Sequence, residues 1–113
     1  MTKYLISFPS EAMDVDADEL PAVADAAHAV IAQAMDAGVY VFGGGIDEDF
    51  TPLLVAGDGT VTDETYPGTE AIRGGFTVVD VPTRDEAVMW ATRIAVACRC
   101  AQEVRAFQFD PLA

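Results

Sequence analysis

The sequence predicts a single α+β domain, and three observations support this prediction. Apolar residues recur every three or four positions in two stretches, 20–34 and 84–97, as in helices that pack on a core. Runs rich in aromatic and β-branched residues flank these helices as strands: 3–8, 39–43, 75–81 and 103–109. A Gly/Asp cluster between two further extended runs indicates a hairpin. The order β-α-β-hairpin-β-α-β predicts a ferredoxin-like antiparallel sheet with both helices on one face.

The composition excludes several classes of function. Six basic and 19 acidic residues give the 113-residue chain a formal charge of −13, which repels nucleic acid and anionic membrane surfaces. Hydrophobic residues make up 51 %, enough to form a core. No apolar run approaches the roughly 20 residues of a membrane span. The N-terminus turns polar after Phe8, too early for a signal peptide, so we expect a cytoplasmic protein.

The first strand and helix have clear boundary signals. The strand at 3–8 ends at Pro9, and a polar loop follows up to residue 18. The helix is expected to begin there, because Asp18 can cap exposed N–H groups and Pro21 is tolerated in a first turn. Gly38 ends this helix, since glycine readily adopts the left-handed conformation found after helix C-termini.

The middle of the chain contains most of the irregular structure. The second strand, 39–43, runs into Gly43-Gly44-Gly45, which we interpret as a bulge or turn where the strand leaves the sheet. Residues 52–56 and 60–62 flank Gly57-Asp58-Gly59, which predicts a hairpin. Beyond it, the chain is expected to be irregular as far as residue 73.

The second half repeats the strand–helix–strand pattern of the first. Residues 75–81 form the clearest strand in the sequence. Thr83 and Glu86 then make a capping box, in which each side chain accepts from the other's backbone N–H. The second helix follows as far as residue 97, and a last strand at 103–109 ends the fold.

Both faces of the predicted sheet carry apolar side chains. In the second strand Val39 and Val41 alternate with Tyr40 and Phe42, and in the last strand Phe107 and Phe109 oppose Val104 and Ala106. Helices on one face normally leave polar residues on the other. The chain has no spare element to cover a second apolar face, so we expect another copy to cover it, which predicts a homodimer.

Four motifs follow one another along the chain: Val61-Thr-Asp-Glu-Thr-Tyr, Gly74-Gly-Phe, Asp85-Glu-Ala-Val-Met-Trp-Ala and Glu103-Val-Arg. Their order and spacing resemble the YCII-related, or DGPF-domain, family. In that family a T-D-G-P-F/Y turn precedes a G-G-F/Y strand, a D-E-A-x-x-W-A helix and an E-V-R strand. The resemblance covers nearly the whole chain. It implies a ferredoxin-like domain that pairs into a dimeric α+β barrel.

The resemblance also implies two functional directions. Some YCII-like members are thought to use a His-Asp pair in a pocket beside the barrel, and others are encoded near extracytoplasmic-function sigma factors, which suggests regulation. This sequence departs from the pattern at the turn, which reads Asp63-Glu64-Thr65-Tyr66 without Gly or Pro. His28 is displaced from the family's histidine by one residue, or about 100° around a helix. We therefore expect catalysis of the His-Asp kind to be weak or absent.

The single histidine, His28, is the main candidate for acid–base chemistry. Asp25 lies three residues before it, close enough on one helix face to orient the ring and raise its basicity. Asp36, two turns further along, is a second candidate for this orienting role. The alternative is a half-exposed histidine at the edge of an acidic helix.

The candidate ligand-binding residues lie on the segment after the turn and on the last strand. Glu70 and Arg73 are placed to line the mouth of a pocket, or else to form an exposed ion pair. Arginine is scarce in this chain, so Arg73 and Arg105 are the best candidates to hold an anionic ligand. Tyr66, the last residue of the turn, joins this group.

No metal site and no cofactor are predicted. Cys98 and Cys100 form a C-x-C pair, which we interpret as two small apolar residues at a helix end, the alternative being a metal or redox pair. The run from Asp14 to Asp18 resembles the start of an EF-hand, but Glu19 replaces the required glycine. The triple glycine lacks the lysine and the helix of a phosphate loop.

Three functions are open on these grounds. The first is a small dimeric domain with a ligand pocket beside the sheet, which predicts that His28 is partly buried and that its ring contacts a cavity. The second is a non-catalytic regulatory or protein-interaction module, which predicts salt-sensitive binding to a basic protein. The third is a weak lyase or hydrolase-like enzyme that uses His28 with a carboxylate.

Overall fold

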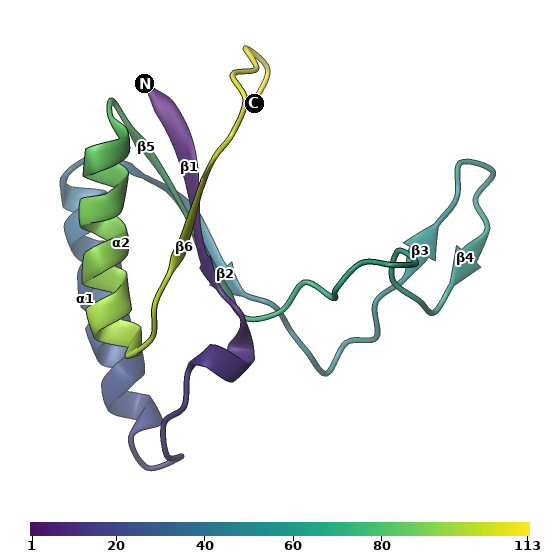
Figure 1. Cartoon of the computed structure of the whole chain (residues 1–113), viewed down its shortest axis with the longest axis horizontal. Helices are drawn as coiled ribbons and strands as arrows, with labels where there is room; N and C mark the ends of the chain where they lie inside the picture. Colours follow the sequence, from purple (N-terminus) through teal and green to yellow (C-terminus); the bar gives the residue numbers. More distant parts are fainter.

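The computed structural model describes residues 1–113 as an antiparallel sheet with two helices packed on one face (Figure 1). The elements in chain order are β1 (Thr2–Phe8), the 3-10 turn η1 (Ser10–Ala12), α1 (Leu20–Asp36), β2 (Tyr40–Gly45), β3 (Leu54–Val55), β4 (Val61–Thr62), β5 (Gly75–Val81), α2 (Arg84–Cys98) and β6 (Glu103–Ala106). The main sheet has the order β2-β5-β1-β6, and each neighbouring pair is antiparallel. This arrangement confirms the predicted α+β fold. The sheet of one chain is open and closes no barrel.

The core lies between the sheet and the two helices. Ile6 of β1 and Val79 and Val81 of β5 are fully buried, because these strands occupy the middle of the sheet beneath both helices. Trp90 and Ile94 of α2 pack into the same cluster. The stripe of apolar residues predicted for each helix therefore faces the sheet, as helical periodicity requires.

The two helices begin in different ways. Thr83 caps α2 as predicted, since its hydroxyl accepts the backbone N–H of Glu86 (3.2 Å). The reciprocal half of the predicted capping box is not formed, because the Glu86 carboxylate accepts no hydrogen bond from the Thr83 N–H. The prediction that Asp18 caps α1 is wrong. The N-cap position is Glu19, which has helical backbone angles and makes no capping hydrogen bond. A turn in which the Glu19 N–H donates to the Asp16 carbonyl (2.9 Å) leads directly into the helix, so no extended residue is placed to cap it.

The β2 strand corrects the prediction for the triple glycine. Gly43, Gly44 and Gly45 continue the ladder with β5 instead of leaving the sheet, because backbone pairing needs no side chain. The irregularity lies earlier, where the register shifts between Tyr40 and Phe42. This bulge adds one residue, so Tyr40 pairs with Val79 on the helix side while Phe42 falls on the opposite face. The strict alternation that we predicted for this strand is therefore wrong.

The last strand is shorter than predicted, ending at Ala106 rather than 109. Ala106 pairs with Tyr4, and the Phe107 N–H still donates to the Lys3 carbonyl (2.9 Å). Beyond that point β1 has almost no residues left to pair with, so the C-terminal tail leaves the sheet (Figure 1).

The face of the main sheet opposite the helices, here called the open face, is covered by no helix or strand of the chain (Figure 1). Only the C-terminal tail borders it, where the Lys3 ammonium donates to the Ala113 main-chain oxygen (2.8 Å). The strand register places Leu5, Phe42, Val78 and Phe107 on it. Phe42 is 67 % exposed. The same register places Lys3, Asp80, Glu103 and Arg105 on the open face, so apolar and charged side chains are mixed there.

Residues 46–73, here called the arm, project from the sheet on the side of the open face (Figure 1). The arm includes the predicted hairpin, formed by β3 and β4. At its turn the Asp58 carboxylate accepts the backbone N–H of Thr60 (2.9 Å), which lowers the pKa of that carboxyl. The projection raises the radius of gyration to 15.8 Å, against about 13 Å for a compact chain of this length.

Candidate functional site

A cavity of about 520 Å³ lies between α1 and the β2–β5 edge of the sheet. Its lining is mainly apolar and comes from every layer of the fold: Phe8, Met13, Leu20, Val23, Ala24, Ala27, His28, Ile31, Tyr40, Gly43, Gly44, Gly45, Gly75, Phe76, Thr77, Ile94 and Cys98. Its size lies in the range of small-molecule sites. The sheet-to-helix space is therefore incompletely filled at this end of the molecule.

The hollow exists because small residues line both of its walls. On the sheet side Gly43 and Gly45 carry no side chain, and on the helix side Ala24 and Ala27 stop at Cβ. A Cβ at Gly75 would lie 2.6 Å from the Phe8 ring, so any larger residue there would displace that ring from the cavity wall. The glycine triplet that extends β2 thus also opens space beneath α1.

Four side chains bring polar atoms to this lining: His28, Tyr40, Thr77 and Cys98. Burial raises the pKa of the Cys98 thiol, and the neighbouring Cys100 raises it further. The thiol is therefore protonated at neutral pH and forms part of the apolar wall rather than a nucleophile. The imidazole of His28 and the hydroxyls of Tyr40 and Thr77 are the side-chain groups that can hydrogen-bond a ligand strongly.

The three candidate acid–base residues all lie on α1, but no hydrogen bond or ion pair joins them. His28 lies at the rim of the cavity as expected, but the residue is exposed, so the prediction that it is partly buried is wrong. Asp25 is exposed, and no hydrogen bond or ion pair joins it to His28. Asp36 is the last residue of the helix, eight positions and about 12 Å of helix from the histidine. Of the three, His28 alone lines the cavity.

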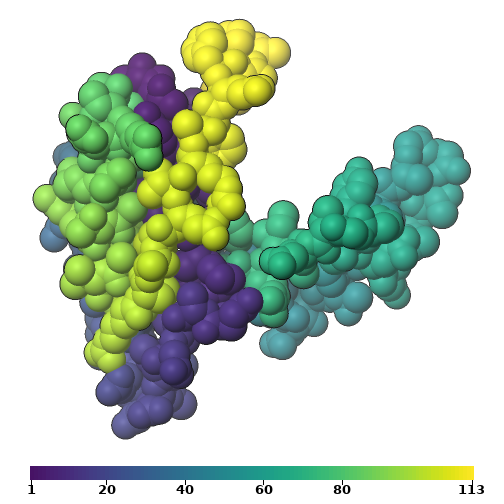
Figure 2. Space-filling model, in the orientation of Figure 1, coloured from purple at the N-terminus to yellow at the C-terminus, as the bar shows by residue number.

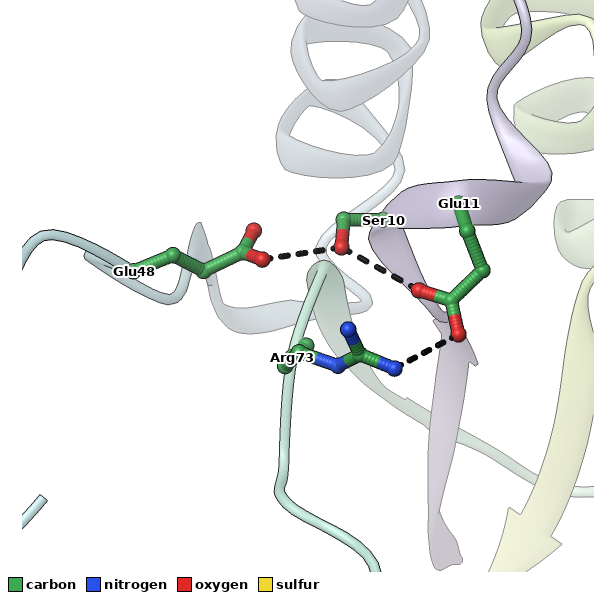
Figure 3. A network of polar contacts seen from close by, with 4 residues as sticks. All are labelled: Ser10, Glu11, Glu48 and Arg73. Atoms are coloured by element: carbon green, nitrogen blue, oxygen red, sulfur yellow. Dashed lines mark hydrogen bonds and ion pairs between the residues drawn. The ribbon is translucent and has the colours of Figure 1, made fainter.

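The candidate ligand-binding residues lie outside the cavity lining. Arg73 ends the arm and donates to Glu11 of η1 (2.7 Å; Figure 3). Tyr66 and Glu70 are exposed on the arm. Arg105 lies on β6 and forms an ion pair with Glu103 of the same strand. The structure therefore does not bring the proposed ligand-binding residues together with His28 at the cavity.

Sequence patterning did not identify most residues of the cavity. Phe8 and Tyr40 read as ordinary strand residues, and Ala24 and Ala27 as part of the helical stripe. One signal was available: three consecutive glycines inside a strand indicate a place where something approaches the backbone closely. That signal does not tell which helix lies opposite, so the cavity itself had to come from the tertiary structure.

Other features have simple structural accounts. Both cysteines are free, Cys98 buried at the end of α2 and Cys100 two residues beyond. The chain brings together no group of three or more His, Cys, Asp or Glu side chains that could hold a metal ion. Neither helix combines the length and apolar character needed to cross a bilayer.

Comparison with protein families gives a match over nearly the whole chain. No curated protein is significantly similar to this chain. The model of the YCII-related domain matches residues 4–109, from β1 to the tail beyond β6. This span includes most of β1, the other three strands of the main sheet, both helices and the arm. The chain therefore belongs to the YCII-related domain family.

Proposed function

We propose that the protein is a small homodimeric domain that binds a small molecule in the cavity beneath α1. The observation that carries this proposal is the apolar hollow of about 520 Å³, with His28 at its rim. An apolar pocket with a few convergent polar groups is the usual form of a small-molecule site. Gly43, Gly44 and Gly45 also expose backbone at the cavity wall, where a flat ring can approach closely.

The lining favours a planar, mainly apolar ligand with one polar substituent. Phe8 and Tyr40 offer aromatic surface, and the polar atoms of His28 and Thr77 are few. No arginine or lysine lines the cavity, so a strongly anionic ligand would find no counter-charge there. Hydroxylated or halogenated aromatic compounds match this chemistry.

The dimer is proposed on the open face of the sheet. Apolar side chains lie there beside charged ones, and the helices of the same chain do not reach them: Leu5, Phe42, Val78 and Phe107. Burial of such a surface by a second copy removes it from water, which favours association. Joining two sheets in this way would leave both cavities on the outer, helix-covered sides of the dimer.

Ligand binding can be tested by NMR titration of the 15N-labelled protein with 4-chlorophenol and 1-naphthol. We expect the largest shift changes at the amides of Gly43–Gly45, Gly75 and His28, because these residues line the cavity. Ala24→Leu should weaken binding about tenfold or more, since the added side chain fills part of the space. Ala26→Leu is the matched control, because Ala26 lies on the same helix but outside the lining. Equal weakening by both variants, or shifts spread over the arm, would contradict the proposal.

A catalytic role for His28 is the second candidate, favoured by its position at the cavity rim. The histidine makes no contact with a carboxylate that would orient it, so we expect no turnover of these aromatic compounds that depends on it. The measurement is product formation with wild type and His28→Ala. A fall in rate of about a hundredfold or more in the variant would establish catalysis by His28.

A further inference from the structure

The arm and the open face both lack a packing partner in the single chain. We propose that in the homodimer the arm of each subunit clasps the other subunit, lying against its body on the side of the open face. This inference rests on the proposed dimer and adds to it a specific contact segment, residues 46–73.

Contacts at the base of the arm fix the direction in which it leaves the body. Ser10 of η1 donates to Glu48 (2.9 Å) at the start of the arm, and Arg73 at its end donates to Glu11 (2.7 Å; Figure 3). The Ile46 N–H also donates to the Gly74 carbonyl (2.8 Å), which closes the two ends of the arm onto the sheet. The arm therefore leaves the body at an orientation set by contacts at its base, away from the helices (Figure 1).

The arm carries apolar side chains that are about half to three-quarters exposed in the single chain. Phe50 is 64 % exposed and Tyr66 72 %, and Leu53, Val55, Val61 and Ile72 are all at least half or nearly half exposed. Residues of this kind normally lie in a core or an interface. Short strands such as β3 and β4, isolated from a larger sheet, are marginally stable unless something packs on them.

The exposed area is sufficient for a stable dimer. Five aromatic side chains of the arm, the open face and the C-terminal tail are each about half to nine-tenths exposed: Phe42, Phe50, Tyr66, Phe107 and Phe109. Aromatic side chains bury about 150–250 Å² each, so these five alone supply about 700 Å² of the roughly 800 Å² per partner in a standard interface. The aliphatic residues of the arm add to this area.

We infer a second copy as the occupant of this surface because one chain presents both a projection and a recess there. A twofold interface requires that each subunit offers both the projecting part and the part that receives it. This chain offers both on the same side: the arm projects there, and a recess lies over the open face between the arm and the C-terminal tail (Figure 2). In a twofold pair, the sheet of each subunit would occupy the recess of the other, beside its arm.

Photo-crosslinking tests the contact directly. p-Benzoylphenylalanine is placed at Phe50 in the full-length protein, and 14N- and 15N-labelled copies are mixed and allowed to exchange. We expect crosslinked peptide pairs that combine both isotopes, because the arm touches the other subunit. The same label at Val96, which is 76 % exposed on α2, is the control and should give no such pairs.

A variant without the arm provides the second measurement. Residues 47–73 are replaced by Asn-Gly, a two-residue turn that suits the hairpin left by Ile46 and Gly74. We expect circular dichroism to show a folded domain and sedimentation to show a dimer dissociation constant raised about a hundredfold or more.

The two measurements separate the proposals. A monomeric wild type would overturn both the dimer and the clasp. A dimeric wild type that crosslinks at Phe50 only within its own chain would overturn the clasp alone, and the dimer would stand. Mixed-isotope pairs from Phe50 but not Val96 support the clasp even where the arm-less variant does not fold.

Discussion

Gly74, where the arm rejoins the sheet, occupies a position that no other residue type fits. Its φ is +92°, and a Cβ there would lie 2.0 Å from the Phe8 carbonyl oxygen and 2.7 Å from the Ser10 nitrogen. Both neighbours are backbone atoms, which cannot move aside as a flexible side chain would. The glycine therefore allows β5 and the end of β1 to approach closely at the base of the arm.

Gly74→Ala should lower the free energy of unfolding by about 3 kcal/mol, from the strained backbone and the clash together. Gly38→Ala is the matched control, because Gly38 also has a positive φ of +74° but no atom lies within 4 Å of its Cβ position. Gly38→Ala should lower the free energy of unfolding by about 1 kcal/mol, from backbone strain alone. Urea unfolding followed by circular dichroism measures both. Equal losses would show that the close approach to Phe8 and Ser10 is unimportant.

At the scale of elements, the two helices differ in how their first turns are stabilised. The N-terminus of α2 is closed by a side-chain cap from Thr83, with Asp85 and Glu86 in its first turn. α1 has no side-chain cap, and its first residues are tied to the rest of the fold by the ion pair between Glu19 and Arg99. Loss of the Thr83 cap of α2 should therefore destabilise the protein more than loss of any single side chain at the start of α1.

Thr83→Ala should destabilise the protein by about 1 kcal/mol, since the Glu86 N–H loses its acceptor. Thr92→Ala on the same helix is the control. The Thr92 hydroxyl donates to the Val88 carbonyl one turn back, which adds little to a helix, so alanine should change stability by less than about 0.5 kcal/mol. Thermal unfolding of the two variants side by side decides this, and a cap variant as stable as wild type would count against the role of Thr83.

At the scale of the whole molecule, charge opposes the association that the apolar surfaces favour. Each copy carries a formal charge of −13, and most of the acidic residues are exposed. Two such copies repel one another in a dimer, and salt screens this repulsion. Salt should therefore strengthen self-association, whereas it would weaken binding of this acidic surface to a basic partner.

We expect the dimer dissociation constant to fall about tenfold between roughly 0.05 M and 0.5 M sodium chloride, where the screening length shortens severalfold. Sedimentation velocity at several protein concentrations measures it. A dissociation constant that rises with salt would mean that attractive ion pairs hold the dimer together. A wild type that stays monomeric throughout would leave the interaction-module alternative as the better reading of the acidic surface.

Local sequence patterns were sufficient to predict the type and order of the elements. Apolar periodicity located both helices, and 75–81 was predicted to the residue as β5. These features are local, because spacing along one segment decides which side of it is apolar. Gly38 has the predicted positive φ, and the Thr83 cap is confirmed, for the same local reason.

The tertiary structure alone decided how segments that are distant in sequence meet. The β5 ladder holds Gly43–Gly45 in the sheet, and the register shift at Tyr40 separates two aromatic side chains that simple alternation places together. The cavity arises where these glycines face the alanines of α1, and the contacts of η1 set the direction of the arm. A sequence pattern reports on one segment at a time, whereas a cavity or an arm is defined by two surfaces, and only packing brings those surfaces together.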